Sequence, residues 1–196
     1  MGDHVNLLTS NSSKLTKDAY ADDQALWISL YKGNNLAFST LYNRYANSLF
    51  NYGMHICYNR DLVKDCIQEL FTWLWKKRTS LPGVVSVKFY LFKSFRNILI
   101  KEINKDRKFT TEPTESDFLD GVISKEEEII AMDLLKSNKS KVASALEKIS
   151  KRQREIVILR FFNEMSYSEI SAMMGISTAS AHNLISKALQ AMKVII

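Results

Sequence analysis

The sequence predicts an all-α protein made of two small helical domains that are joined by an acidic flexible linker. The chain has 196 residues with only 6 Gly and 2 Pro, which are too few for a turn-rich β fold. Its apolar residues recur at helical spacing on both sides of one polar segment. That segment, residues 110–135, holds 1 Lys against 8 Asp and Glu, whereas residues 1–109 and 136–196 carry net charges of +7 and +6.

These differences in charge divide the chain into an N-terminal extension (residues 1–20), a first domain (21–109), a linker (110–135) and a second domain (136–196). The linker is rich in Thr, Ser and Glu around Pro113 and cannot bury enough apolar surface to fold alone. In the free protein it either shields the basic domains or is simply solvated.

The first domain is predicted to consist of successive capped helices. Asp22 and Asp23 are placed to cap a short helix, Asn59 a third helix and Ser86 a fourth. Glycine and proline in Gly33-Asn34-Asn35 and Leu81-Pro82-Gly83 separate the helices. The expected helices cover residues 22–31, 36–52, 60–78 and 86–107, and a further helix is expected near residues 126–135, ahead of the second domain.

The helix over residues 60–78 has one apolar and one polar face. Its core stripe, at i, i+4, i+7, i+8 and i+11, is Val63, Ile67, Leu70, Phe71 and Leu74. The opposite, mostly acidic and amide face gathers Asp61, Asp65, Gln68, Glu69, Thr72 and Lys76. Trp73 and Trp75 flank the stripe and are interpreted as packing residues. By itself such a polar face indicates only a solvated surface.

The helix over residues 86–107 has a basic outer face. Its buried side is expected to be Leu91, Phe95, Ile98 and Leu99. The outer side presents Lys93, Asn97, Lys101, Asn104, Arg107 and Lys108, with Arg96 at its edge. Such side chains suit contacts to phosphates, and Asn also reads base edges, although many solvated helices share this pattern.

The second domain carries a helix-turn-helix pattern. Ser150 is placed to cap a helix through Phe162, with Ile156, Leu159 and Phe162 on its inner side. Ser166 and Glu169 have capping-box spacing for a short helix that Gly175 closes.

Ser177 is expected to cap the second helix of this motif, whose apolar stripe is Ala181, Leu184, Ile185, Ala188, Leu189 and Met192. The residues expected to face a DNA major groove are Ser177, Thr178, Ala179, Ser180, His182, Asn183, Ser186 and Lys187. An ordinary antiparallel helix pair is the alternative.

Several classes of function have little support in the sequence. Cys57 and Cys66 lack metal-ligand spacing and are predicted to be core thiols, and His4, His55 and His182 lie far apart. We therefore predict no catalytic residue, no metal, no cofactor and no small-molecule substrate. No stretch approaches the length of a membrane span, so we predict a cytoplasmic protein that is not integral to the membrane. The net charge of +6 favours a polyanionic partner.

Motifs in both domains resemble one known family, the extracytoplasmic-function (ECF) sigma factors of bacterial RNA polymerase. The first-domain motifs are Leu26-Trp27, Ala37-Phe38, Leu41-Tyr42, Arg44-Tyr45, Asp65-Cys66-Ile67-Gln68-Glu69-Leu70-Phe71, Trp75-Lys76-Lys77-Arg78, Tyr90-Leu91-Phe92 and Arg96-Asn97, which are similar to conserved region 2. The second-domain motifs are Gln153-Arg154-Glu155, Ser166-Tyr167-Ser168-Glu169-Ile170, Gly175-Ile176-Ser177 and Ser186-Lys187-Ala188-Leu189, which are similar to region 4.

The resemblance implies a transcription initiation factor that binds core RNA polymerase and promoter DNA, with an anti-sigma factor as a further partner. It implies that Asp65, Gln68 and Glu69 contact the polymerase, and that the basic helix and residues 79–87 engage the −10 element and capture a flipped base. It also implies that the helix-turn-helix reads the −35 element, about 25 base pairs or roughly 85 Å away. The alternative is a helix-turn-helix regulator that does not dock on polymerase.

Overall fold

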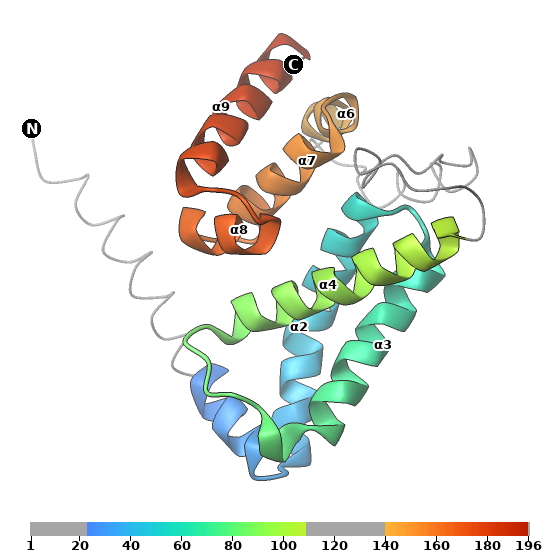
Figure 1. Ribbon diagram of the computed structural model, residues 1–196, viewed down its shortest axis with the longest axis vertical. Helices are drawn as coiled ribbons and strands as arrows, with labels where there is room; N and C mark the ends of the chain where they lie inside the picture. Colours follow the sequence, from blue (N-terminus) through green and yellow to red (C-terminus); the bar gives the residue numbers. More distant parts are fainter. Residues whose placement is uncertain (1–22, 109–139, 196) are drawn as a thin grey trace, which may run out of the picture.

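Residues 23–108 and 140–195 are described by the computed structural model, and all the regular structure within them is helical (Figure 1). The prediction of an all-α protein is therefore confirmed. A helix at residues 23–31 precedes α2 (Asn35–Ile56), α3 (Arg60–Lys76), the 3-10 turn η1 (Arg78–Ser80) and α4 (Val87–Lys108). The C-terminal part holds α6 (Ser140–Lys148), α7 (Lys151–Val157), the π-helical segment η2 (Ile158–Phe162), α8 (Tyr167–Met174) and α9 (Thr178–Ile195). The N-terminal extension, the linker and the helix expected near residues 126–135 lie outside the described residues.

Most helices begin at the caps that the sequence predicts. The Asn59 side chain accepts a hydrogen bond from the Leu62 amide, and Ser86 Oγ accepts one from the Phe89 amide at 3.1 Å. Ser150 and Ser166 each form a complete capping box, with Gln153 and Glu169 respectively. These local signals fix the starts of α3, α4, α7 and α8.

Asp23 differs from the prediction, because it is buried and helical instead of capping a helix from solvent. Its carboxylate accepts hydrogen bonds from Arg44 Nη1 at 2.5 Å and from the Tyr45 hydroxyl. A buried carboxylate needs such partners, and α2 supplies them. The predicted partner in capping, Asp22, lies outside the described residues.

The core of the N-terminal domain lies where α2, α3 and α4 pack together. The predicted α3 stripe is buried at every position, as are Leu91, Phe95 and Leu99 of α4; Ile98 is half-buried, and Phe92, which was not predicted, is fully buried. The closest approach is at Gly53 of α2, where an added Cβ would lie 2.8 Å from Val63 Cγ1 and 2.9 Å from Phe95 Cζ. A larger residue at this position would push the side chains of α3 and α4 away from α2.

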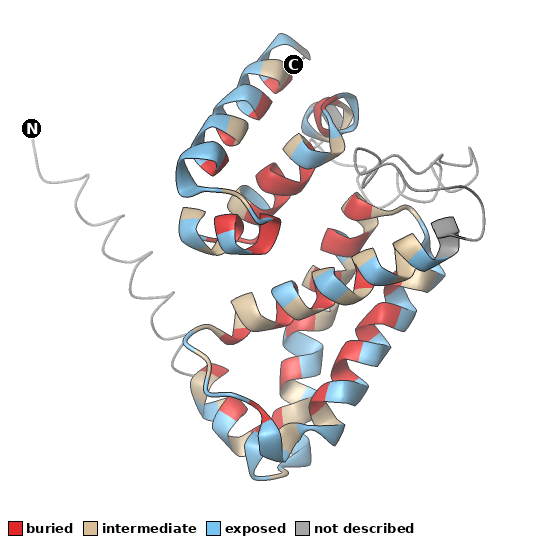
Figure 2. Cartoon of the chain, in the orientation of Figure 1, coloured by how far each residue is buried: buried red, intermediate tan, exposed pale blue. Residues whose placement is uncertain are grey.

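The C-terminal domain packs α7, α8 and α9 around buried Ile156, Leu159, Ile185 and Met192. Gly175, at φ 65°, closes α8 in the left-handed conformation, as the sequence predicts. Figure 2 shows α7 as a mostly buried helix between its neighbours.

Two predictions of inward-facing residues in this domain were wrong. Phe162 is 55% exposed and Leu189 is 43% exposed. The helix that starts at Ser150 widens into the π-helical turn η2, which adds residues to the turn and rotates its last side chains outward. Leu189 lies at the edge of the α9 stripe, where the partners of α9 no longer cover it.

The two domains contact each other through α2 and α4 on one side and α7, η2 and α8 on the other. Figure 1 shows α8 directly above α4. The buried apolar residues of both domains form one continuous cluster. The described parts of the chain therefore pack as a single body in which the C-terminal domain covers part of α4.

Candidate functional site

The acidic face of α3 forms an open groove of about 440 Å³, lined by Asp65, Gln68, Glu69, Thr72, Trp73 and Lys76. All six side chains are exposed, so the face is available to a partner. Trp73 was predicted to be a packing residue, but it is 44% exposed and lines the groove. Its place at the edge of the apolar stripe is the signal that would have revealed this, because an aromatic ring at such an edge faces both core and solvent.

Asp61 lies on the same side of α3 but outside this groove. Its side chain is 89% exposed and pairs with Lys64 Nζ at 3.5 Å. Asp61 therefore provides a charge of the same sign on the same helix that does not line the groove.

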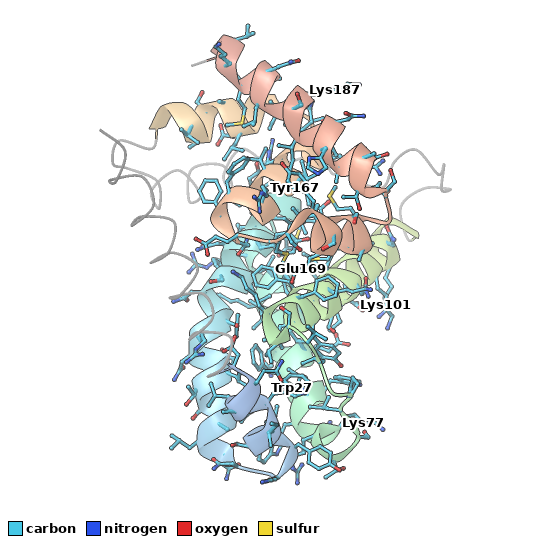
Figure 3. All side chains as sticks on the ribbon, turned by 90° about the vertical axis from the view of Figure 1, so that its left-hand side faces the viewer. Trp27, Lys77, Lys101, Tyr167, Glu169 and Lys187 are labelled. Carbon is cyan, nitrogen blue, oxygen red and sulfur yellow. The ribbon has the colours of Figure 1, made fainter. Side chains whose placement is uncertain are left out.

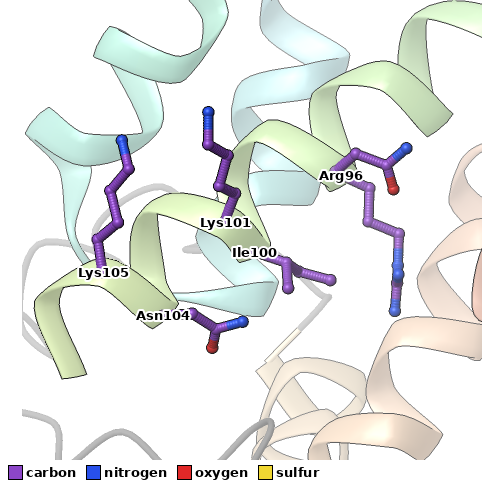
Figure 4. Close-up of a pocket in the computed structure, with 6 residues that line it drawn as sticks. Arg96, Ile100, Lys101, Asn104 and Lys105 are labelled. Atoms are coloured by element: carbon purple, nitrogen blue, oxygen red, sulfur yellow. The ribbon is translucent and has the colours of Figure 1, made fainter. Parts of the chain in front are cut away.

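The outer face of α4 forms a second shallow groove of about 460 Å³, lined by Arg96, Asn97, Ile100, Lys101, Asn104 and Lys105 (Figure 4). It contains four of the predicted DNA-binding residues. Lys93 is also exposed, with Nζ 5.5 Å from the centre of the Phe89 ring. Arg107 and Lys108 belong to α4, but their side chains are not described. Ile100 and Lys105 were not predicted, and their spacing on α4 brings them to the same groove.

Arg96 points away from the other cations of α4 and toward the C-terminal domain (Figure 4). Its Nε donates to Glu155 Oε1 of α7 at 2.6 Å. The same carboxylate oxygen accepts a hydrogen bond from the Tyr52 hydroxyl of α2 at 2.8 Å. Because Glu155 is only 3% exposed, this is a buried polar cluster between the domains. Burial, and then the charge of Glu155, raises the pKa of Tyr52 well above its ordinary value, so Tyr52 remains a donor.

A second polar cluster lies beside the first. Arg154 of α7 donates to the Tyr58 hydroxyl and to the carbonyl oxygens of Leu146 and Glu147. The pKa of His55, at the end of α2, is lowered to about 4 by burial and by the charge of Arg154. The imidazole is therefore neutral at pH 7, and protonation of His55 would place two cations together at the interface.

The predicted reading residues, which are Ser177 before α9 and seven residues within it, are all exposed. Ser177 Oγ accepts the Ser180 amide at 3.1 Å and so begins α9. His182 stacks on Tyr167 of α8 with ring centroids 3.5 Å apart, and Arg160 lies over the same Tyr167 ring at 5.0 Å. Figure 3 shows Lys187 on α9 and Lys101 on α4, in different domains.

The two cysteines differ in burial, so the prediction of a core thiol is confirmed for Cys66 but not for Cys57. Cys66 is buried as predicted, and burial raises its pKa to about 12, whereas Cys57 is only half-buried. Within residues 23–108 and 140–195 there is no group of three or more His, Cys, Asp or Glu side chains that could hold a metal ion. In the same part of the chain, no helix combines the length and the hydropathy of a membrane span.

Comparison with known proteins identifies the second domain directly. Residues 139–192 match the family described as sigma-70, region 4. The match contains α6, α7, α8 and most of α9, which are the helices of the predicted helix-turn-helix domain.

Relatives extend the similarity to most of the chain. The ECF RNA polymerase sigma factor RpoE of Cereibacter sphaeroides is 22% identical over 87% of this chain and 95% of its own length. The RNA polymerase sigma factor YlaC of Bacillus subtilis is 24% identical over 76% of this chain and 85% of its own. The chain is a sigma factor. Sigma factors are transcription initiation factors without an enzymatic activity of their own.

Solved structures share the fold of this sigma factor. CnrH in complex with the cytosolic domain of CnrY superimposes with a TM-score of 0.61 at 20% identity, over 88% of this chain and 96% of the other. RpoE in complex with the anti-sigma factor NepR, from Bartonella quintana, gives a TM-score of 0.58 at 18% identity, over 81% and 95% of the two chains.

Proposed function

We propose that this sigma factor binds core RNA polymerase through the groove on α3, engages the −10 element through α4 and the loop that precedes it, and reads the −35 element through α9. The observation that carries the proposal is that α3 presents Asp65, Gln68 and Glu69 together in one exposed groove. Acidic and amide side chains beside an exposed Trp73 suit a basic protein partner better than they suit DNA.

The DNA contacts are divided between two surfaces of different chemistry. On α4, Lys93, Arg96, Asn97, Lys101 and Asn104 combine phosphate-binding cations with amides that suit base edges. On α9 the exposed residues are small and polar, with His182 and Lys187 as the larger side chains. The smaller number of cations predicts that α9 contributes modest affinity, and that the polymerase adds to it by holding both domains near the duplex.

The packed arrangement of the two domains must open before both elements are read. Helix α8 contacts both α4 and α9, and neighbouring helices pack about 8–10 Å apart. The two DNA-binding faces are thus much closer together than the roughly 85 Å that separates the promoter elements. The state in which Glu155 pairs with Arg96 is therefore a resting state of the free protein.

A protein that controls this factor is also part of the proposal. The solved relatives are complexes with the cytosolic domain of CnrY and with the anti-sigma factor NepR. We expect an anti-sigma partner to bind this chain and to compete with the polymerase. We expect the protein to act in the cytoplasm together with the polymerase.

A regulator that binds DNA without docking on polymerase is not favoured. Such a regulator requires only the helix-turn-helix domain, whereas the similarity to RpoE covers 87% of the chain and so includes most of the N-terminal domain. The exposed groove on α3 has no role in that alternative.

Charge reversal on α3 tests the proposal. Labelled native protein and the Asp65→Arg, Glu69→Arg double variant are titrated with core polymerase, and binding is followed by fluorescence anisotropy. Because unlike charges at an interface would become like charges, we expect binding to weaken roughly 100-fold or more. The matched control is Asp61→Arg, which changes a charge on the same helix outside the groove. Failure of the native chain to bind, or full binding by the folded double variant, would contradict the docking role.

A further inference from the structure

The loop between α3 and α4, residues 81–86, is held by side chains of the helix at residues 23–31. Gln24 Nε2 donates to the carbonyl oxygen of Val84 at 2.6 Å and to that of Val85 at 3.0 Å. Trp27 Nε1 donates to the carbonyl oxygen of Pro82 at 3.1 Å. Three backbone carbonyls of one short loop are therefore bound by two side chains that are about 60 residues away in sequence. Figure 1 shows this loop running beside the blue helix of residues 23–31.

The helix that provides these contacts is itself firmly placed. Asp23 binds Arg44 and Tyr45 of α2, and Trp27, which is 4% exposed, packs edge-on against Tyr90 of α4 with ring centroids 5.1 Å apart. The loop is anchored at both ends by Leu81 and Val87, which are buried. The loop backbone is thus fixed from one side and at both ends.

The loop also presents an apolar side chain to solvent. Val85 is 98% exposed, although its own carbonyl is bound by Gln24. A single exposed valine is ordinary on a protein surface. The feature that suits contact with a partner is the ordered backbone of this exposed loop, which Gln24 and Trp27 hold through three carbonyl oxygens. Apolar side chains that insert between base steps pack against bases that have lost a stacking neighbour.

We propose that Gln24 and Trp27 are positioning residues that hold the α3–α4 loop in the shape in which it receives an unstacked promoter base, with Val85 against that base. This inference rests on the proposed function, in which the loop engages the −10 element. A loop that is already ordered loses less conformational entropy when it captures a base, so the anchors increase both the affinity and the selectivity of capture. Neither anchor needs to touch DNA.

The test compares variants that remove the anchors without removing the loop. Gln24→Glu replaces the amide donor with a carboxylate that repels the two carbonyls, and Gln24→Met removes the donor without adding charge. Trp27→Phe removes the indole N–H and keeps an aromatic ring in the core. The matched control is Ala25→Glu, which adds the same charge at an exposed neighbouring position.

Each variant is assembled with core polymerase and presented with a random-sequence DNA pool from which the native holoenzyme selects promoters. The base preference at each −10 position is read from the selected DNA. We expect the anchor variants to lose preference at one −10 position by about 5-fold or more, as for the loss of one base contact. For the anchor variants, core affinity and the base preference at the −35 element should stay at native values. For Ala25→Glu, the base preference at the −10 element should stay native as well.

Base preference is a readout that a purely structural role would not move selectively. If Gln24→Met and Trp27→Phe fold, bind core and select the native −10 bases, the positioning role is wrong. A general fall in melting temperature and core affinity that leaves base preference intact overturns it equally. If the native holoenzyme selects no −10 sequence at all, the proposed function fails, and the positioning role fails with it.

Discussion

Helices α3 and α4 are neighbours in the N-terminal domain, and each presents a polar groove, but the grooves differ in charge and in what covers them. All the side chains that line the α3 groove are exposed. On α4, Arg96 is bound to Glu155 of the C-terminal domain. Under the proposed function the resting protein is thus open to polymerase but partly closed to the −10 element. Under this function, we expect docking on polymerase to come before contact with the promoter.

The largest expected effect comes from removing the Glu155 carboxylate, which pairs with Arg96 of α4. Glu155→Ala leaves Arg96 and Tyr52 without their buried partner. Removing one member of a buried ion pair destabilises the packed state by roughly 3 kcal/mol or more. Because the domains can separate and return Arg96 to water, we expect the open state to be favoured by about 100-fold or more. Small-angle X-ray scattering should show a larger radius of gyration, and the protein without polymerase should bind DNA more tightly.

We expect the α3 groove, and with it polymerase binding, to be unaffected by this change. Glu155→Ala should bind core polymerase at least as tightly as the native chain. Glu147→Ala, an exposed carboxylate in the same domain, is the matched control and should scatter like the native protein. A folded Glu155→Ala variant with native dimensions would show that Glu155 does not hold the domains together.

Acid should open the same interface, with a smaller effect. The pKa of His55 is lowered from 6.5 to about 4 by burial and by Arg154. The separated or unfolded chain therefore binds more protons between pH 6.5 and 4, so the stability present above pH 6.5 is lost as the pH falls toward 4. With a discount for partial exposure, we expect a loss of about 2 kcal/mol over this range.

Urea unfolding and scattering across pH 4 to 7 measure this loss. His55→Gln removes the titrating group and should flatten the pH dependence, because its side chain stays neutral. Equal slopes for the native protein and for His55→Gln would assign the acid sensitivity to other groups.

The smallest effect should come from a single exposed cation on α4. Lys101→Ala removes one expected phosphate contact, so promoter affinity of the holoenzyme should fall by about 2- to 5-fold. The slope of log affinity against log salt concentration should become shallower by about 1. Core affinity should not change. Lys64→Ala, an exposed lysine on α3, should leave promoter affinity and its salt dependence unchanged. If both lysines alter the salt dependence equally, the division between an α3 face for protein and an α4 face for DNA does not hold.

The features that could be predicted from the sequence are those set by local spacing. The caps at Asn59, Ser150 and Ser166 and the left-handed Gly175 depend on residues within about one turn of each other, and the buried stripe of α3 depends on spacing within a single helix. The exposed reading residues of α9 follow from the same periodicity. Their binding roles remain predictions, because exposure does not identify what is bound.

Where the sequence prediction was wrong or incomplete, a contact distant in sequence or a local irregularity decided the outcome. Phe162 faces outward because η2 is a π-helical turn, and a fixed angle of 100° per residue does not describe such a turn. Asp23 is buried because Arg44 and Tyr45 of α2 reach it. Trp73 lines the α3 groove because its ring is 44% exposed at the edge of the buried stripe.

The sequence by itself determined the helices, the charge of each helix face and the helix-turn-helix, because helix periodicity and capping are short-range properties of the chain. Only the tertiary structure decided that Arg96 binds Glu155, 59 residues away, and that Gln24 holds a loop 60 residues away. The physical reason is that a charged or amide side chain on a helix surface has many possible partners in sequence. The packing of the helices brings one of them within hydrogen-bonding distance and removes the water that would otherwise compete.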